Sequence, residues 1–206
     1  MNTDVLRKEY TQRYETALVQ LAGAIQVQLT DYLSETPRID RIGARAKTVD
    51  KFLAKARNKD DTGAPKYEEP LDQIQDQVGA RIIVFYLSDV ENVARVIERY
   101  YHHVESRLVV PDSQWKFGYF GRHFILLMPK GLSRPGVSKE HVPQFFELQI
   151  KTLFQHAWSE ANHDLGYKPT GIPPDPDFER QLAFTSAQSW GADKIFDELH
   201  RSRSGQ

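Results

Sequence analysis

The sequence predicts an α/β fold of the α+β type, in which helices flank a mixed β-sheet of about five strands. Short β-branched runs alternate with helical patterns along the chain, which is typical of such sheets. Amphipathic patterns at both ends add an N-terminal helix within residues 1–36 and a C-terminal helix over 177–199. The length of 206 residues fits one domain over 1–206, whose motif-bearing core spans 38–168.

Each predicted element has a local reason. Apolar residues recur every three or four positions from 4 to 34, and Pro37 ends this first helix. A basic stretch over 45–57 is also predicted as a helix, and 58–70 has the composition of a loop. After a short helix or turn over 71–77, the continuous apolar sequence of 80–86 indicates a buried strand. The remaining elements are a helix over 90–101, strands over 104–110, 122–128 and 145–151, and a helix over 153–164.

Composition excludes several classes of function. The chain has 40% hydrophobic and 27% charged residues, as ordinary globular proteins do, and no apolar run approaches the roughly 20 residues of a membrane helix. The N-terminus lacks the apolar core of a signal peptide. The absence of cysteine excludes disulfides, thiolate zinc sites and a cysteine nucleophile, and it fits a cytoplasmic location. Because the net charge is −1, any site for an anion must be local.

The strand over 145–151 concentrates polar chemistry. Apolar residues occupy positions 146, 148 and 150, whereas the opposite face carries Glu147, Gln149 and Lys151. Burying a carboxylate, an amide and an ammonium group is costly without partners, so this face is either wet or a site. Glu147 is a candidate Mg²⁺ ligand or general base, and His156 on the following helix is a candidate substrate contact.

The basic stretch and the segment before the strand over 80–86 both suggest a polyphosphate site. On a helix, Lys47, Lys51 and Lys55 share one face, where like charges repel unless an anion meets them; a solvated face is the alternative. Asp76 precedes the strand and suits Mg²⁺, which takes one or two carboxylates plus phosphate oxygens. The alternatives are that Asp76 caps a turn or pairs with Arg81.

A glycine-bracketed aromatic pair, Tyr119 and Phe120, lies between Lys116 and His123. An aromatic side chain in such a loop provides a stacking platform for a nucleotide base. The alternative is the entry to a hairpin, with an aromatic ring packed inward.

Five motifs in order resemble the synthetase domain of the RelA/SpoT family, and specifically its small single-domain alarmone synthetases. The resemblance covers roughly residues 38–168. It implies a nucleotidyltransferase-like synthetase fold and Mg²⁺-dependent transfer of pyrophosphate from ATP to the ribose 3′-hydroxyl of GDP or GTP, giving ppGpp or pppGpp. The matching segments are Arg45-Ala46-Lys47-Thr48 with Lys55, Asp76 to Ile82, Gly118-Tyr119-Phe120-Gly121-Arg122-His123, Glu147-Leu148-Gln149-Ile150-Lys151-Thr152, and Gln155-His156-Ala157-Trp158 with His163 and Tyr167-Lys168.

Carried over by matching position, the resemblance implies a role for each side chain. Asp76 and Glu147 hold Mg²⁺, and Glu147 also accepts the proton of the attacking hydroxyl group. The ATP-binding residues are two guanidinium groups that stack on adenine and two ammonium groups that neutralise the triphosphate: Arg45, Arg81, Lys47 and Lys55. Tyr119 stacks on the acceptor base, and the other acceptor-binding residues are Lys116, His123, Gln149 and His156.

The chain departs from the family pattern at four positions, and these leave the acceptor open. Gly121 and Lys51 replace serines, Lys151 replaces an arginine, and His156 stands where many small synthetases have asparagine. One alternative keeps the chemistry but uses the tRNA 3′ end or an adenosine nucleotide, in a growth-inhibiting toxin with an antitoxin partner. Another is an inactive nucleotide-binding module, although both carboxylates are present. The resemblance also leaves open whether the terminal helices form a homo-oligomer interface or only cover the sheet.

Overall fold

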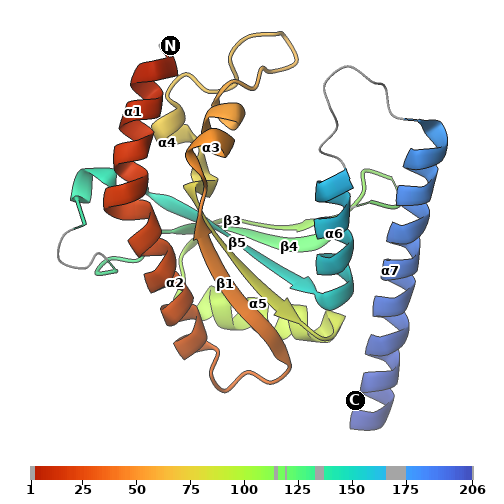
Figure 1. Cartoon of the computed structure of the whole chain (residues 1–206). Helices are drawn as coiled ribbons and strands as arrows, with labels where there is room; N and C mark the ends of the chain where they lie inside the picture. Colours follow the sequence, from red (N-terminus) through yellow and green to blue (C-terminus); the bar gives the residue numbers. More distant parts are fainter. Residues whose placement is uncertain (1–2, 114–115, 119, 133–136, 166–174, 206) are drawn as a thin grey trace.

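The computed structural model describes residues 3–113, 116–118, 120–132, 137–165 and 175–205. A five-stranded sheet lies at its centre, in the order β1-β2-β5-β4-β3 (Figure 1). β2 and β5 run parallel, whereas the other neighbouring strands are antiparallel, which confirms the predicted mixed sheet. The strands are β1 (Ile39–Ala46), β2 (Val78–Val84), β3 (His103–Val109), β4 (Gly121–Leu127) and β5 (Phe145–Thr152).

Strand β1 corrects the sequence prediction of a helix over 45–57. Arg45 pairs with Gly79 in the antiparallel β1–β2 ladder, so helix α3 (Val49–Ala56) begins only four residues later. Without β1, the apolar strand β2 would present an open edge of unpaired backbone groups. This strand pairing outweighs the helix propensity of the alanine, arginine and lysine residues, which is a weak local preference.

The predicted N-terminal helix is confirmed. It consists of α1 (Thr3–Arg13), a π turn (Tyr14–Leu18) and α2 (Val19–Tyr32), which follow one another without a break. Helix α2 and helix α5 (Leu87–Tyr100) both contact the sheet, and their buried side chains share one apolar cluster with it. In β5, residues 146, 148 and 150 are fully buried in this cluster, as the alternation of the sequence predicted.

The opposite face of the sheet is polar, and strand register arranges its side chains in rows. Gly43, Arg81, Gln149 and His123 are successive cross-strand partners on β1, β2, β5 and β4. Because directly paired residues share one face, the side chains of these residues other than Gly43, and that of Glu147, lie on the same side of the sheet. Helix α6 (Leu153–Leu165) follows β5 directly and contacts both β5 and β2.

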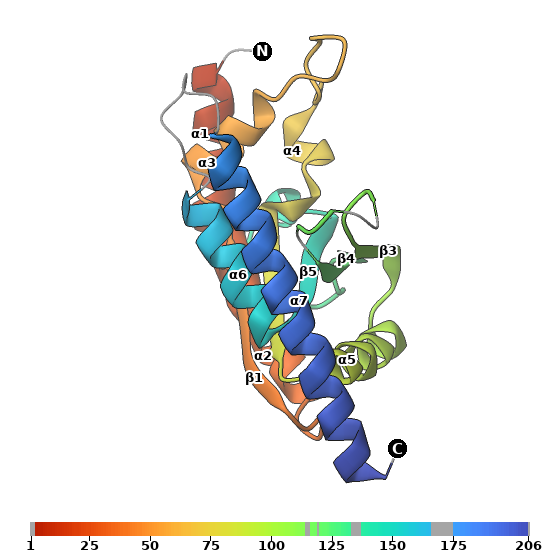
Figure 2. The same ribbon diagram turned by 90° about the vertical axis from the view of Figure 1, so that its right-hand side faces the viewer.

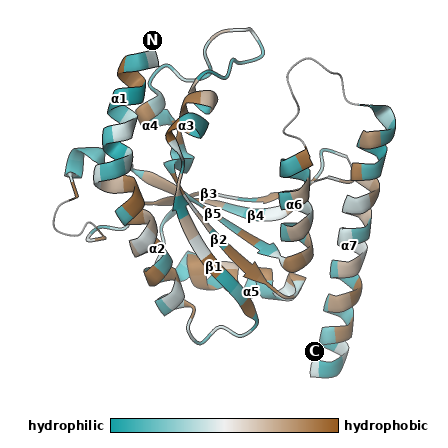
Figure 3. Ribbon diagram, viewed as in Figure 1, coloured by the Kyte–Doolittle hydropathy of each residue, from teal (hydrophilic) through white to brown (hydrophobic). Residues whose placement is uncertain are grey.

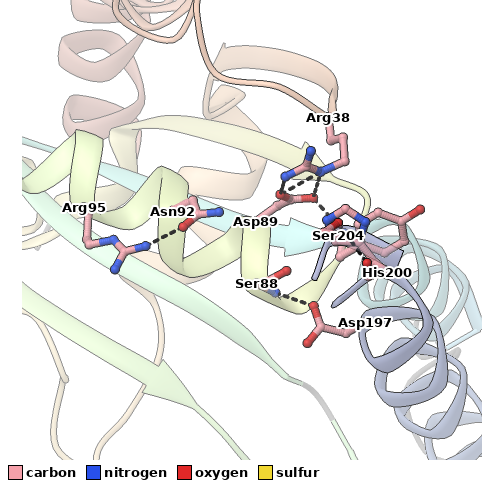
Figure 4. Close-up of polar contacts among 9 residues, drawn as sticks. Arg38, Ser88, Asp89, Asn92, Arg95, Asp197, His200 and Ser204 are labelled. Atoms are coloured by element: carbon pink, nitrogen blue, oxygen red, sulfur yellow. Dashed lines mark hydrogen bonds and ion pairs between the residues drawn. The ribbon is translucent and has the colours of Figure 1, made fainter. Parts of the chain in front are cut away.

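The C-terminal helix α7 (Pro176–Ser204) extends beyond the predicted 177–199 at both ends. It packs beside α6 and reaches the start of α5 (Figures 1 and 2). The backbone N–H of Ser88 in α5 donates to Asp197 of α7 at 2.8 Å (Figure 4). Hydrophilic and hydrophobic residues are mixed along the length of α7 (Figure 3).

The predicted short helix or turn over 71–77 is confirmed as helix α4 (Pro70–Gln73) and a 3₁₀ turn, η2 (Gln75–Gln77). A second 3₁₀ turn, η3 (Lys139–His141), precedes β5. Within the described ranges, no helix combines the length and the hydropathy needed to cross a membrane.

Candidate active site

Two adjoining cavities, of about 380 Å³ and 470 Å³, open on the polar face of the sheet. Both are lined by Arg45, Arg81, Glu147 and Gln149, so they form one site over β1, β2 and β5. Most of the predicted site residues therefore meet in one place. The smaller cavity also has Arg41 and His156 in its wall, and the larger one has Lys47, Lys51, Asp76, Lys151, Ser159 and His163.

Asp76 holds the two lysines that were predicted to bind a triphosphate. Its Oδ2 atom lies 2.9 Å from Lys47 Nζ and 3.0 Å from Lys55 Nζ. Burial alone would raise the pKa of the Asp76 carboxyl, but the two adjacent ammonium groups outweigh burial and lower it. Asp76 is therefore the anionic partner of both lysines within the protein. The alternative pairing of Asp76 with Arg81 is wrong, because Arg81 pairs with Glu160 instead.

The N-terminal helix fixes the segments that carry these groups. The hydroxyl of Tyr10 donates to the backbone carbonyl of Lys47 at 2.8 Å. Arg13 Nη1 donates to the backbone carbonyl of Leu71 at 2.7 Å and to the side chain of Gln77 at 3.2 Å. Sequence reasoning missed these supporting residues, because nothing in a local pattern indicates which segment an N-terminal helix will contact.

Glu147 lies in a second polar cluster on the same face. His123 Nδ1 is 3.1 Å from its Oε1 atom, and Gln149 Nε2 donates to its Oε2 atom at 3.1 Å. Burial would raise the pKa of the Glu147 carboxyl, but the hydrogen bond and charge of His123 outweigh burial and lower it. The predicted residues Glu147, His123 and Gln149 are thus brought together by the β4–β5 register.

The Asp76 and Glu147 carboxylates fit a divalent cation. Both line the larger cavity, and the charge of Asp76 acts to raise the pKa of Glu147. Within the described residues, Asp76 Oδ1 is buried without a hydrogen-bond partner, so one carboxylate oxygen is left for a ligand. The described part of the chain has no cluster of three or more metal-binding side chains. This sparse donor set suits Mg²⁺, which usually completes its shell with water and substrate phosphates.

Two side chains of helix α6 contact Arg81 on the polar face of the sheet. Arg81 Nη1 donates to Glu160 Oε1 at 2.7 Å and lies 3.3 Å from His156 Nδ1. His156 and Glu160 are four residues apart, so they share one face of α6. Burial and the Arg81 charge lower the pKa of His156. His156 was predicted to contact the acceptor, and its neighbour here is one of the two arginines predicted to bind ATP.

Lys151 is an additional cation in the larger cavity. Its ammonium group donates to Ser159 Oγ at 3.1 Å, and the residue is only 3% exposed. Burial, with a smaller contribution from Arg81, lowers the pKa of Lys151 to about 8. Glu160 and Ser159 were not singled out from the sequence, although their spacing from His156 along one helix was a usable signal.

Two predicted acceptor-binding residues are not part of the site described above. Lys116 is exposed, with its Nζ atom 3.1 Å from Asp112 Oδ2, and it is not part of either cavity wall. Tyr119 falls outside the described residues. The neighbouring Gly118 accepts a hydrogen bond at its carbonyl from Ser186 of α7 at 2.6 Å.

A carboxylate pair thus lies beside lysines and arginines on a mixed sheet flanked by helices. The chain belongs to the RelA/SpoT family: the family model described as the region found in RelA / SpoT proteins matches residues 44–172, more than half of the chain. Within this family the protein is a homologue of the small alarmone synthetases.

Two curated relatives from Bacillus subtilis (strain 168) support this placement. GTP pyrophosphokinase YjbM is 28% identical over 168 residues, which cover 81% of this chain and 74% of YjbM. GTP pyrophosphokinase YwaC is 30% identical over 134 residues, which cover 63% of this chain and 59% of YwaC. The protein is thus a distant homologue of GTP pyrophosphokinases.

Solved structures confirm the fold. Small alarmone synthetase 1 from Bacillus subtilis superimposes with a TM-score of 0.73 at 22% identity, covering 97% of this chain and 98% of that one. Small alarmone synthetase 2 from the same organism also gives 0.73, at 21% identity, covering 95% of this chain and 98% of that one. The mixed sheet with long terminal helices is therefore the alarmone synthetase fold.

Proposed function

We propose that the protein transfers pyrophosphate from ATP to the ribose 3′-hydroxyl of GDP or GTP in a Mg²⁺-dependent reaction. One observation carries this proposal: Asp76 and Glu147, far apart in the sequence, line one cavity beside Lys47 and Lys151. Phosphoryl-type transfer asks mainly for positioning and for neutralisation of charge, which these groups supply without a covalent nucleophile.

The donor ATP occupies the side of the site next to β1. Arg45 and Arg81 line both cavities and present planar guanidinium groups, which stack well on the adenine ring. Lys47 and Lys55, which meet at Asp76, neutralise the triphosphate. A solved structure of small alarmone synthetase 1 from Bacillus subtilis is bound to AMPCPP, which supports a site for an adenine nucleotide in this fold.

Glu147 is the general base of the proposed reaction. Because the pKa of its carboxyl is lowered, it is ionised at neutral pH and accepts the proton of the 3′-hydroxyl group. The hydroxyl oxygen forms a bond to the β-phosphorus of ATP, the bond from that phosphorus to the α–β bridging oxygen breaks, and AMP leaves. Mg²⁺ held by Asp76 and Glu147 would stabilise negative charge on the phosphate oxygens.

The acceptor nucleotide contacts the β4 side of the site. His123 hydrogen-bonds Glu147, so it lies next to the group that activates the hydroxyl. By the family resemblance Tyr119 stacks on the acceptor base, with Lys116 and Gln149 as further contacts. A second structure of small alarmone synthetase 1 is bound to its product pppGpp, which supports a guanine nucleotide as acceptor. We assign His156 to the donor side or the boundary between the substrates, because it contacts Arg81.

The identity of the labelled product tests the proposal. The protein is incubated with Mg²⁺, γ-labelled ATP and, separately, GDP, GTP, unlabelled ATP or bulk tRNA, with Glu147→Gln as the inactive control. We expect label on GDP and GTP only. Label on the tRNA 3′ end or on an adenosine nucleotide would replace the proposed acceptor with that of a toxic synthetase. Transfer to none of them would indicate an inactive nucleotide-binding module.

A further inference from the structure

We infer that Ser186 of α7 is a positioning residue for the acceptor loop, defined here by its described residues 116–118 and 120–121. The inference rests on the proposed function, in which this loop binds the acceptor nucleotide. Residues of α7 belong to none of the five sequence motifs and line neither of the two cavities. The structure nevertheless joins this helix to the loop that precedes β4.

The contact between α7 and the loop involves two consecutive loop residues. The hydroxyl of Ser186 donates to the carbonyl oxygen of Gly118 at 2.6 Å, and Ser186 is only 2% exposed. One turn further along α7, the Trp190 ring contacts the Phe117 ring edge-on, with their centroids 5.9 Å apart. Because Ser186 and Trp190 are four residues apart, one face of the helix holds both Phe117 and Gly118.

Helix α7 is itself fixed to the body of the protein at several points. Trp158 Nε1 on α6 donates to the carbonyl of Leu182 at 3.3 Å and to Thr185 Oγ1 at 3.1 Å, just before Ser186 in the helix. Further along, Thr152 at the end of β5 donates to Asp193 at 2.8 Å. The hydrogen bond to Gly118 therefore ties the loop to a helix that cannot shift without breaking other contacts.

These contacts fix the loop relative to the catalytic carboxylate. The last loop residue, Gly121, is also the first residue of β4, which brings His123 to Glu147. On its other side, the loop is held by Ser186. A mostly apolar cavity of about 210 Å³ lies between α7 and the loop, and its wall includes Gly118, Phe120 and Ser186. Ser186 thus acts through the backbone of the loop and touches no reacting group.

The experiment compares Ser186→Ala with Ser189→Ala. Ser189 lies on the same helix and lines the same small cavity, and no hydrogen bond joins its side chain to the described loop residues, so it is a matched control. Two quantities are measured: amide hydrogen exchange of residues 116–121 in the protein without substrates, and the KM values for the acceptor and for ATP. Melting temperatures check that both variants are folded.

We expect Ser186→Ala to speed exchange in the loop about fivefold and to raise the acceptor KM about fivefold, as the loss of one hydrogen bond does. The KM of Ser186→Ala for ATP should remain as in the wild type. Ser189→Ala should match the wild type in loop exchange and in both KM values. Trp190→Leu, which removes the ring contact with Phe117, should act in the same direction.

The outcomes separate this inference from the proposed function. If the wild type transfers pyrophosphate to GDP or GTP but Ser186→Ala leaves loop exchange unchanged, the inference alone is wrong. Faster exchange with an unchanged acceptor KM, or an equal rise in the KM for ATP, would also overturn the positioning role. A wild-type protein that transfers label to no acceptor would defeat the proposed function first, and the positioning role with it.

Discussion

Ionisation of Asp193 should oppose the docking of α7, and its replacement by asparagine should remove this effect. Asp193 is 2% exposed and accepts a hydrogen bond from Thr152 at 2.8 Å. Its Oδ1 atom is buried with no hydrogen-bond partner in the described part of the chain. Burial raises the pKa of this carboxyl from 3.8 to about 7, against the lowering effect of the Thr152 hydrogen bond and with a further rise from the charge of Asp197.

The sign and size of the effect follow from this pKa. Because the pKa of Asp193 is higher in the folded state, the protonated carboxyl stabilises the fold. This stabilisation is complete at a pH below 3.8 and is lost as the pH rises through about 7. A difference of about three pKa units corresponds to at most about 4 kcal/mol, of which about 3 kcal/mol is lost between pH 5 and pH 9. Asp193→Asn keeps an oxygen that accepts from Thr152 but carries no charge at any pH.

The assay is urea unfolding of the wild type and Asp193→Asn at several pH values from 5 to 9. We expect the free energy of unfolding of the variant to rise, relative to the wild type, by up to about 3 kcal/mol over this range. Parallel pH profiles would refute the reasoning.

A control of opposite sign lies one turn away on the same helix. Burial acts to raise the pKa of Asp197, but hydrogen bonds from Ser88 and the charge of Arg201 outweigh burial and lower it. The Asp197 carboxylate therefore stabilises the fold above its usual pKa, and this stabilisation is lost as the pH falls through the lowered value. Asp197→Asn should be less stable than the wild type at neutral pH, and the difference should shrink in acid.

Three predictions concern the reaction. Asp76→Asn and Glu147→Gln should each lower kcat about 10²-fold or more while the variant remains folded, because each removes an oriented charge; near wild-type turnover would contradict the roles assigned to them. Tyr119→Ala should weaken acceptor binding by about 1–3 kcal/mol in calorimetry, the value of base stacking, while a raised Kd for ATP alone would reverse the assignment. Glu160→Gln should raise the KM for ATP several-fold, because Arg81 loses a charged partner, and an unchanged KM would show that Glu160 does not orient Arg81.

Much of the fold was predictable because hydrophobic periodicity records burial directly. The alternation of β5 and the three- to four-residue steps of the N-terminal helix both appear in the structure. Strand β1 was not predictable in this way, because its last residues, Ala44 to Ala46, favour a helix locally. What makes them a strand is the hydrogen-bonding edge of β2, which is more than 30 residues away in the sequence.

The candidate site, like the fold, was predictable only in part. Sequence motifs identified the groups that line the cavities, because burying carboxylates and cations on a strand face is costly without partners. Their pairing was not predictable: Asp76 contacts Lys47 and Lys55 rather than Arg81, and Ser186 meets Gly118 across 68 positions of sequence. Such contacts depend on how distant segments pack, which no local pattern encodes.

Asp76 pairs with both Lys47 and Lys55, so two ammonium groups share one carboxylate and this cluster keeps a net positive charge. A lysine that leaves Asp76 for a phosphate oxygen exchanges one anionic partner for another, and the Oδ1 atom of Asp76, which has no hydrogen-bond partner in the described part of the chain, remains for a cation. If the protein has the proposed function, metal and nucleotide should therefore each bind more tightly in the presence of the other.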